Sequence, residues 1–275
     1  MNNLFGKKQC ILYNTVQIAY YFLPNSGKET IFLLHPAFAD AEIFEEQIEA
    51  FCDDYQLLLM DFPGHGNSEA KGTKATTADV PLIMKMILDE VGISKCHVVG
   101  VSLGSLIAQA FAARYAGKTI SVTIIGGYSI HKANDKILRA QGQNIVMFAL
   151  YLIFSMKKFR RFIINETGGG DRFREVFGRG IQKFRRASFP AMSNMNALFE
   201  KKDTPMPYPF LIVCGEHDRE LARDAAAVLH DLEPDSRYVL IPDAGHCANI
   251  DNPEVFNSIL RGFLSETRYP SGDFS

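Results

Sequence analysis

Residues 100–104 read GVSLG, which places Ser102 between two glycines. The apolar residues 96–101 are typical of a buried strand, and residues 103–115 have the apolar spacing of a helix. In a sharp strand-to-helix turn a serine hydroxyl is exposed at the edge of a sheet, and glycines on either side let strand and helix pack closely. The pattern predicts that Ser102 is a nucleophile. The plainer alternative is a serine that caps the following helix.

A nucleophilic serine needs a base, and His246 is the candidate. It lies between a predicted strand at 238–241 and a predicted helix at 253–264. An imidazole accepts a proton near neutral pH, which few other side chains do. A lone loop histidine is usually just exposed to solvent, but the order serine, aspartate, histidine along the chain favours a catalytic base.

The base in turn needs a carboxylate that fixes its tautomer and stabilises the imidazolium. Asp218 follows the predicted strand 210–214, at the carboxyl end where sites collect in open α/β sheets. We therefore predict that Asp218 is the acid. Its rivals are Glu216, Asp243 and Asp251.

Attack on a carbonyl group creates a negatively charged oxygen that needs hydrogen-bond donors. One donor after such a turn is the backbone N–H of the next residue, Leu103, and the other comes from a loop after an earlier strand. Here that loop follows residues 30–34. Pro36 has no N–H, so Ala37 or Phe38 supplies it, and Ala37 is favoured.

The elements that position these residues alternate between strands and helices. This order predicts βαβ units with right-handed crossovers and a mostly parallel sheet, an α/β fold. Strands are predicted at 10–13, 16–22, 30–34, 56–60, 96–101, 120–125, 210–214 and 238–241. Helices are predicted at 41–51, 77–91, 103–115, 220–232 and 253–264.

One connection is far longer than the two to six residues usual between a strand and a helix. We interpret residues 129–205 as an inserted helical lid, and residues 1–128 and 206–275 as the core. The glycines at 168–170 break the lid in the middle. Its helices are predicted at 136–154, 159–164, 172–179 and 189–199.

Four segments together resemble a known family. Residues 35–36 (HP) resemble its His-Gly oxyanion loop, and residues 61–68 (DFPGHGNS) resemble its D-x-P-G-x-G-x-S turn. Residues 215–218 (GEHD) and 245–246 (GH) resemble its acid and base segments. The chain thus resembles the α/β-hydrolase superfamily, specifically its lidded branch of esterases and carbon–carbon bond hydrolases. Pro36 departs from the usual glycine, which stiffens the loop.

The neighbouring histidines and cysteine have structural roles in this interpretation. We expect His35 to hold the oxyanion loop by hydrogen bonding, and His65 to shape a turn with the glycines beside it. Cys247 is next to the base but has no activating partner of its own.

The lid is apolar and basic. Its large apolar side chains favour a hydrophobic acyl or aromatic group, with Phe38, Val101, Phe148 and Tyr151 as predicted substrate contacts. Residues 157–186 contain ten Lys or Arg against three acidic residues. Such a run is usually a solvated face. The alternative is attraction of anionic substrates or of an acidic membrane surface.

Composition limits the remaining possibilities. The 275 residues carry a formal net charge of −2, which does not favour nucleic acid as a partner. Five scattered cysteines lack a CxxC pair or zinc spacing, so we expect reduced thiols, a cytoplasmic protein and no metal or other cofactor. No signal peptide is evident, and the longest apolar run, 145–154, is half the ~20 residues that a membrane-spanning helix needs.

These observations predict hydrolysis of a carboxylic ester or thioester through an acyl-enzyme. Cleavage of a carbon–carbon bond in a vinylogous diketone by the same triad is the first alternative. The second is a small-molecule receptor that keeps the triad and signals through its lid. The sequence gives no oligomeric state.

Overall fold

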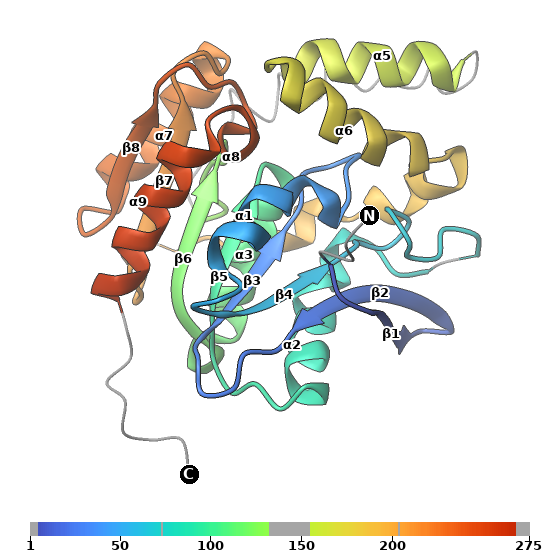
Figure 1. The fold of residues 1–275 in the computed structure, drawn as a ribbon, viewed down its shortest axis with the longest axis horizontal. Coiled ribbons are helices and arrows are strands. Elements are labelled where there is room, and N and C mark those ends of the chain that lie inside the picture. Colours follow the sequence, from blue (N-terminus) through green and yellow to red (C-terminus); the bar gives the residue numbers. More distant parts are fainter. Residues whose placement is uncertain (1–4, 73, 132–154, 203, 268–275) are drawn as a thin grey trace.

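A central sheet of eight strands organises the protein (Figure 1). The computed structural model describes residues 5–72, 74–131, 155–202 and 204–267. The strand order is β1-β2-β4-β3-β5-β6-β7-β8; β2 is antiparallel to β1 and β4, and the other neighbours are parallel. The predicted mostly parallel sheet is confirmed. The strands are β1 (Lys8–Tyr13), β2 (Val16–Leu23), β3 (Thr30–Leu34), β4 (Gln56–Met60), β5 (Cys96–Val101), β6 (Thr119–Ile125), β7 (Phe210–Gly215) and β8 (Arg237–Ile241).

Helices follow most of the parallel strands, as predicted. The predicted helix 189–199 is wrong, because Ser193 is extended and Asn194 is left-handed, which divides the segment into two 3-10 turns. The α-helices are α1 (Glu45–Phe51), α2 (Val80–Glu90), α3 (Leu103–Arg114), α5 (Met156–Thr167), α6 (Asp171–Lys183), α7 (Glu220–Leu232), α8 (Ala248–Asp251) and α9 (Pro253–Glu266). The 3-10 turns are η1 (Ala41–Phe44), η2 (Thr77–Asp79), η3 (Ala116–Lys118), η4 (Arg186–Met192) and η5 (Met195–Leu198).

The sheet is buried on both faces. In β3, Phe32 and Leu34 belong to one apolar cluster, whereas Ile31 and Leu33 belong to the other, as the period of two in a strand requires. Residues of α2, α3 and α7 complete the first cluster, and residues of α1 and α9 complete the second. The carboxyl ends of the parallel strands are therefore held at one edge of a rigid layer.

Residues 155–202, between β6 and β7, are here called the insert. Figure 1 shows its helices α5 and α6 beyond the carboxyl ends of the strands. Phe159, Phe173 and Phe177 are fully buried in the cluster that also contains residues of α1 and α9, so the insert shares the core of the sheet. The predicted helix 136–154, with Phe148 and Tyr151, lies outside the described residues.

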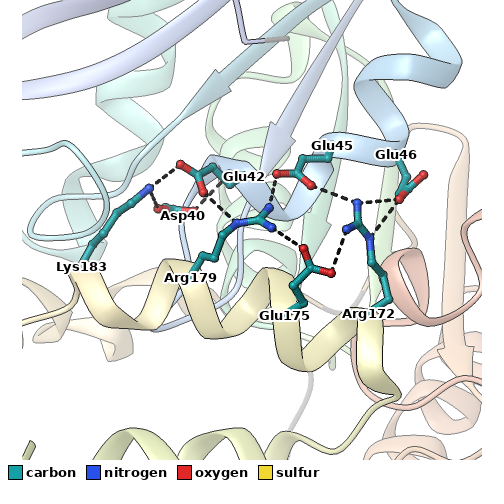
Figure 2. A network of polar contacts seen from close by, with 8 residues as sticks. All are labelled: Asp40, Glu42, Glu45, Glu46, Arg172, Glu175, Arg179 and Lys183. Atoms are coloured by element: carbon teal, nitrogen blue, oxygen red, sulfur yellow. Dashed lines mark hydrogen bonds and ion pairs between the residues drawn. The ribbon is translucent and has the colours of Figure 1, made fainter. Parts of the chain in front are cut away.

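Helix α6 is also fastened by ion pairs (Figure 2). Arg172 lies 2.9 Å from Glu46, and Lys183 lies 2.7 Å from Asp40, so basic side chains of the insert face acidic side chains at η1 and α1. At least three of the ten basic residues predicted to form a solvated or anion-attracting face thus pair within the chain. The network consists of Asp40, Glu42, Glu45, Glu46, Arg172, Glu175, Arg179 and Lys183.

Among the helices that the structure describes, none combines the length and apolar character that crossing a membrane requires. All five cysteines lie in the described residues, and none forms a disulfide.

Candidate active site

Ser102 occupies a strained turn between β5 and α3. Its backbone has φ 51° and ψ −110°, a conformation that residues other than glycine rarely adopt. Its N–H donates to the carbonyl oxygen of Ile125, at the end of the neighbouring strand β6, over 2.8 Å. This is the turn that the sequence predicts for a nucleophilic serine, and it holds the side chain at the carboxyl edge of the sheet.

Two glycines make the turn sterically possible. A Cβ atom on Gly100 would lie 2.2 Å from the carbonyl oxygen of Gly104. A Cβ atom on Gly104 would lie 2.2 Å from the carbonyl oxygen of Leu34, in β3. Both clashes are with backbone, which cannot move aside cheaply. The predicted role of the glycines in strand–helix packing is confirmed.

His246 and Asp218 are in direct contact. Nδ1 of His246 lies 2.9 Å from Oδ2 and 3.1 Å from Oδ1 of Asp218, and both side chains are nearly buried. Oδ1 also accepts the backbone N–H of Arg219 over 2.7 Å. The geometry places the imidazole proton on Nδ1, facing the carboxylate, and leaves Nε2 as the proton acceptor.

The carboxylate of Asp218 is held in its charged form. Burial, the largest single influence, opposes ionisation, but the hydrogen bond and charge of His246 and the N–H of Arg219 outweigh it, so the pKa of Asp218 is lowered. The rivals lie elsewhere: Glu216 and Asp243 are exposed, and Asp251 accepts backbone N–H groups. Asp218 is therefore the carboxylate paired with the imidazole.

Gly126 lies next to both the turn of Ser102 and the ring of His246. It follows Ile125, which accepts the N–H of Ser102, and a Cβ atom on Gly126 would lie 2.9 Å from the imidazole of His246. A Cβ atom on Gly127 would lie 2.1 Å from the hydroxyl of Ser105. Glycine at 126 therefore leaves room for the imidazole of His246, and glycine at 127 leaves room for the side chain of Ser105. The sequence prediction missed this pair, although two glycines directly after a strand are a readable turn signal.

His35 fixes the loop that follows β3. Its Nδ1–H donates to the carbonyl oxygen of Pro36 over 2.7 Å, and its Nε2 accepts the N–H of Phe62 over 2.9 Å. Burial lowers the pKa of His35 to about 3, so the ring is neutral. The predicted role of His35 in holding the loop is confirmed.

The loop residues predicted as oxyanion donors lie near the start of α3. A Cβ atom on Gly104 would lie 2.9 Å from the carbonyl oxygen of His35, so this loop abuts the first turn of the helix. Leu103 is the first helical residue, and its N–H has no intrahelical acceptor. Ala37 and Phe38 are half-buried, and Phe38 has a φ of 67°. The choice between them stays a prediction.

Phe38 extends from this loop into an aromatic cluster of the insert. Its ring centroid lies 5.1 Å from that of Phe184 and 5.3 Å from that of Phe159, both at nearly right angles. Val101 is fully buried in the same apolar cluster of the core. Their predicted contacts with substrate are not tested by these positions.

The turn at residues 61–68 is structural. Asp61 accepts the N–H groups of Ala41 and Asn67 over 2.9 and 2.8 Å. His65 is buried, with Nδ1 3.0 Å from the carbonyl oxygen of Pro63; burial, and then the nearby His35, lower its pKa to about 3. The predicted shaping role is confirmed.

Other chemically capable side chains are poorly placed for catalysis. Burial, followed by the charges of Asp251 and Asp218, raises the pKa of the Cys247 thiol well above its usual value, so it is no nucleophile at neutral pH. Among the described residues, the ligand atoms of Glu216, His217 and Asp243 lie within 4.8 Å of one another, but all three are exposed.

Comparison with known proteins identifies the family and similar folds. A family model, the alpha/beta hydrolase family, matches residues 31–259. A 2-hydroxy-6-oxononadienedioate/2-hydroxy-6-oxononatrienedioate hydrolase of a Pseudomonas species is 23% identical over 253 residues, covering 87% of this chain and 89% of that protein. A pimeloyl-(acyl-carrier protein) methyl ester esterase of Aeromonas hydrophila is 24% identical over 244 residues, covering 84% and 94%. A thermophilic esterase of Thermogutta terrifontis shares the fold, with a TM-score of 0.78 at 19% identity, covering 96% and 100%.

Proposed function

Because this chain belongs to the alpha/beta hydrolase family, we propose that it is a serine hydrolase with Ser102 as nucleophile, His246 as base and Asp218 as the acid that orients the base. The observation that carries the proposal is the buried Asp218–His246 pair beside the strained turn of Ser102. A family match alone would support a hydrolase without assigning these roles.

The arrangement supports a two-step reaction. Nε2 of His246 takes the hydroxyl proton as the oxygen of Ser102 attacks the substrate carbonyl carbon. The N–H groups of Leu103 and of Ala37, or alternatively Phe38, stabilise the resulting oxyanion. Collapse breaks the bond to the leaving alcohol or thiol, which receives the proton from His246. Water, deprotonated by the same imidazole, then releases the acid and restores the serine.

A small hydrophobic carboxylic ester or thioester is the substrate class we favour. Phe38 lies against phenyl rings of the insert, which suits an apolar acyl group, and we propose that the insert serves as the lid of the site. A relative named as a methyl ester esterase supports the ester.

Carbon–carbon bond cleavage in a vinylogous diketone is the second candidate. It is favoured by the similarity to proteins named as hydrolases of 2-hydroxy-6-oxononadienedioate. The same serine, imidazole and carboxylate would serve this reaction.

The nucleophile is tested with a fluorophosphonate probe. Ser102→Ala should abolish labelling and lower turnover by several orders of magnitude, with an unchanged circular dichroism spectrum. Ser258→Ala, which changes an exposed serine of α9, is the control and should label like the wild type. Labelling retained by Ser102→Ala refutes the assignment.

A substrate panel separates the two candidate reactions. Purified protein is given p-nitrophenyl esters of graded acyl length and a 2-hydroxy-6-oxo-dienoate. Turnover of the esters alone supports the first candidate, and turnover of the dienoate alone supports the second.

A further inference from the structure

Gly169 and Gly170, in the turn between α5 and α6, lie near the loop that carries His246. Gly169 has a φ of 114°, and a Cβ atom there would lie 2.5 Å from the ring of Phe173. A Cβ atom on Gly245 would lie 3.4 Å from the backbone nitrogen of Gly169. The backbone of the insert thus lies close to the backbone directly before His246, near enough that a side chain on Gly245 would contact Gly169 and the carboxylate of Asp251.

The carboxylate of Asp251 accepts a hydrogen bond from each of these two backbone segments. Oδ2 of Asp251 accepts the N–H of Gly245 over 2.9 Å, and Oδ1 accepts the N–H of Gly170 over 2.9 Å. Gly245 immediately precedes His246, and Gly170 is the N-cap of α6. Asp251 ends the short helix α8, and its own N–H donates to the carbonyl oxygen of Cys247, so the chain folds back on the loop.

We propose that Asp251 is a positioning residue that couples the start of α6 to the placement of His246. The inference rests on the proposed function, in which His246 is the base. Hydrogen bonds from N–H groups to an ionised acceptor are stronger than neutral ones, and each of these two also restrains the other through the shared carboxylate. Small displacements of a catalytic group lower the reaction rate strongly. We therefore expect slower reaction when the loop of the base loses this restraint.

The rest of α6 is held independently of Asp251. Its ion pairs with η1 and α1 extend along the helix to Lys183 (Figure 2). The phenyl rings of Phe173 and Phe177 are buried further along the same helix. Removing the single bond at Gly170 should therefore leave α6 in place, and the effect on His246 can be measured by itself.

Gly170→Pro removes this bond, and its Cδ atom, which takes the place of the amide hydrogen, also pushes Oδ1 of Asp251 away from the start of α6. The φ of Gly170 is −74°, close to that of proline, and proline has no N–H. Gly170→Ala is the matched variant: it keeps the N–H, and its Cβ atom would lie 3.8 Å from Asp251, an ordinary contact. We expect Gly170→Pro to slow fluorophosphonate labelling about tenfold relative to Gly170→Ala.

Asp251→Asn tests the other side of the bridge. An amide has one oxygen to accept a hydrogen bond, so one of the two N–H groups loses its partner. Asp243→Asn is the control, because it removes the same charge near the base from an exposed side chain, and asparagine tolerates its φ of 54°. We expect labelling to slow at least about tenfold in Asp251→Asn and to be unchanged in Asp243→Asn.

Kinetics distinguish positioning from a general loss of stability. For a p-nitrophenyl ester, kcat should fall in Gly170→Pro and in Asp251→Asn while KM and the melting temperature change little. A variant that carries both substitutions should have a kcat no lower than that of the slower single variant.

Equal rates of labelling for Gly170→Pro and Gly170→Ala overturn the coupling. Equal rates of labelling for Asp243→Asn and Asp251→Asn overturn it as well. If Gly170→Pro fails to fold, the comparison of Asp251→Asn with Asp243→Asn tests the coupling instead. A wild-type protein that the probe does not label overturns the proposed function itself, whereas labelled proteins with equal rates overturn the coupling alone.

Discussion

Replacing Asp218 by asparagine should reverse the tautomer of His246. Oδ1 of Asp218 accepts the N–H of Arg219 over 2.7 Å, and Oδ2 lies 2.9 Å from Nδ1 of the imidazole. In Asp218→Asn the amide oxygen stays with the Arg219 donor, so the amide NH₂ takes the position of Oδ2, which is the oxygen nearer to Nδ1. The imidazole then places its proton on Nε2 to accept from the amide, and Nε2 ceases to be a base.

The expected loss is large. The variant must either react from the unfavourable tautomer or give up the hydrogen bond of a buried amide, and it also loses the charge that stabilises the imidazolium. Substitutions of this kind lower kcat by about 10⁴, which corresponds to about 5.5 kcal/mol in the barrier. The assay is turnover of a p-nitrophenyl ester, together with the rate of fluorophosphonate labelling at neutral pH. Because asparagine is nearly isosteric, the circular dichroism spectrum should not change.

Glu216→Gln provides the matched control. Glu216 belongs to the same loop but is exposed, and its carboxylate accepts a weak 3.4 Å bond from the N–H of Asp243. Its substitution should change kcat less than about twofold, since a surface group in high dielectric interacts weakly with the base. If Asp218→Asn keeps more than a tenth of the wild-type kcat, the tautomer argument is wrong. If Glu216→Gln shows the larger loss, the acid has been assigned to the wrong residue.

Three further predictions concern stability. Gly104→Ala should lower the free energy of unfolding by about 3 kcal/mol relative to Gly117→Ala, because its Cβ atom would lie 2.2 Å from a backbone oxygen. A Cβ atom on Gly117 would meet nothing within 4 Å. Urea titrations measure the difference, and equal unfolding midpoints would contradict the prediction. Arg179→Gln should cost about 1 kcal/mol at low salt and less in about 1 M NaCl, because its ion pairs are partly exposed and screened; a salt-independent cost would count against it. Burial, with the charge of Asp40, raises the pKa of Asp61 from 3.8 to about 7, so the folded state binds this proton more tightly than the unfolded state. Its stabilising contribution is then full below about pH 4 and declines up to about pH 7, and the stability of the wild type relative to Asp61→Asn should fall across that window.

The sheet was the most predictable part of the fold. The mainly apolar runs match β3, β4 and β5 at both ends, because a strand buried on two faces is mostly apolar; His97 in β5 is a buried exception, with Nδ1 2.8 Å from the hydroxyl of Ser121. Helix starts were less predictable. The predicted helix at 41–51 begins as the 3-10 turn η1, where the side chain of Asp40 accepts the N–H of Glu42. Apolar spacing does not distinguish an initial 3-10 turn from an α-helical one.

In the candidate site, residue type and position at strand ends were enough to select Ser102, Asp218 and His246 for a common edge. The sequence could not show which carboxylate faces the imidazole, because that depends on how the loop turns after β7. From the sequence alone, Asp251 is only a rival for the acid. Its contacts with two backbone N–H groups arise from the fold-back of α8, a four-residue helix that no periodicity reveals.

The burial of α6 bears on how substrate could reach Ser102. Phe173, Phe177 and Ile181 of this helix are almost fully buried against the core, and exposing each would cost about 2–3 kcal/mol. Their sum is a large part of the 5–15 kcal/mol that stabilises a typical domain. Lifting α6 as a rigid lid would therefore be nearly as rare as unfolding. Helix α6 thus stays fixed against the core, which is why the bond from Gly170, its N-cap, to Asp251 can restrain the loop of His246 throughout the reaction.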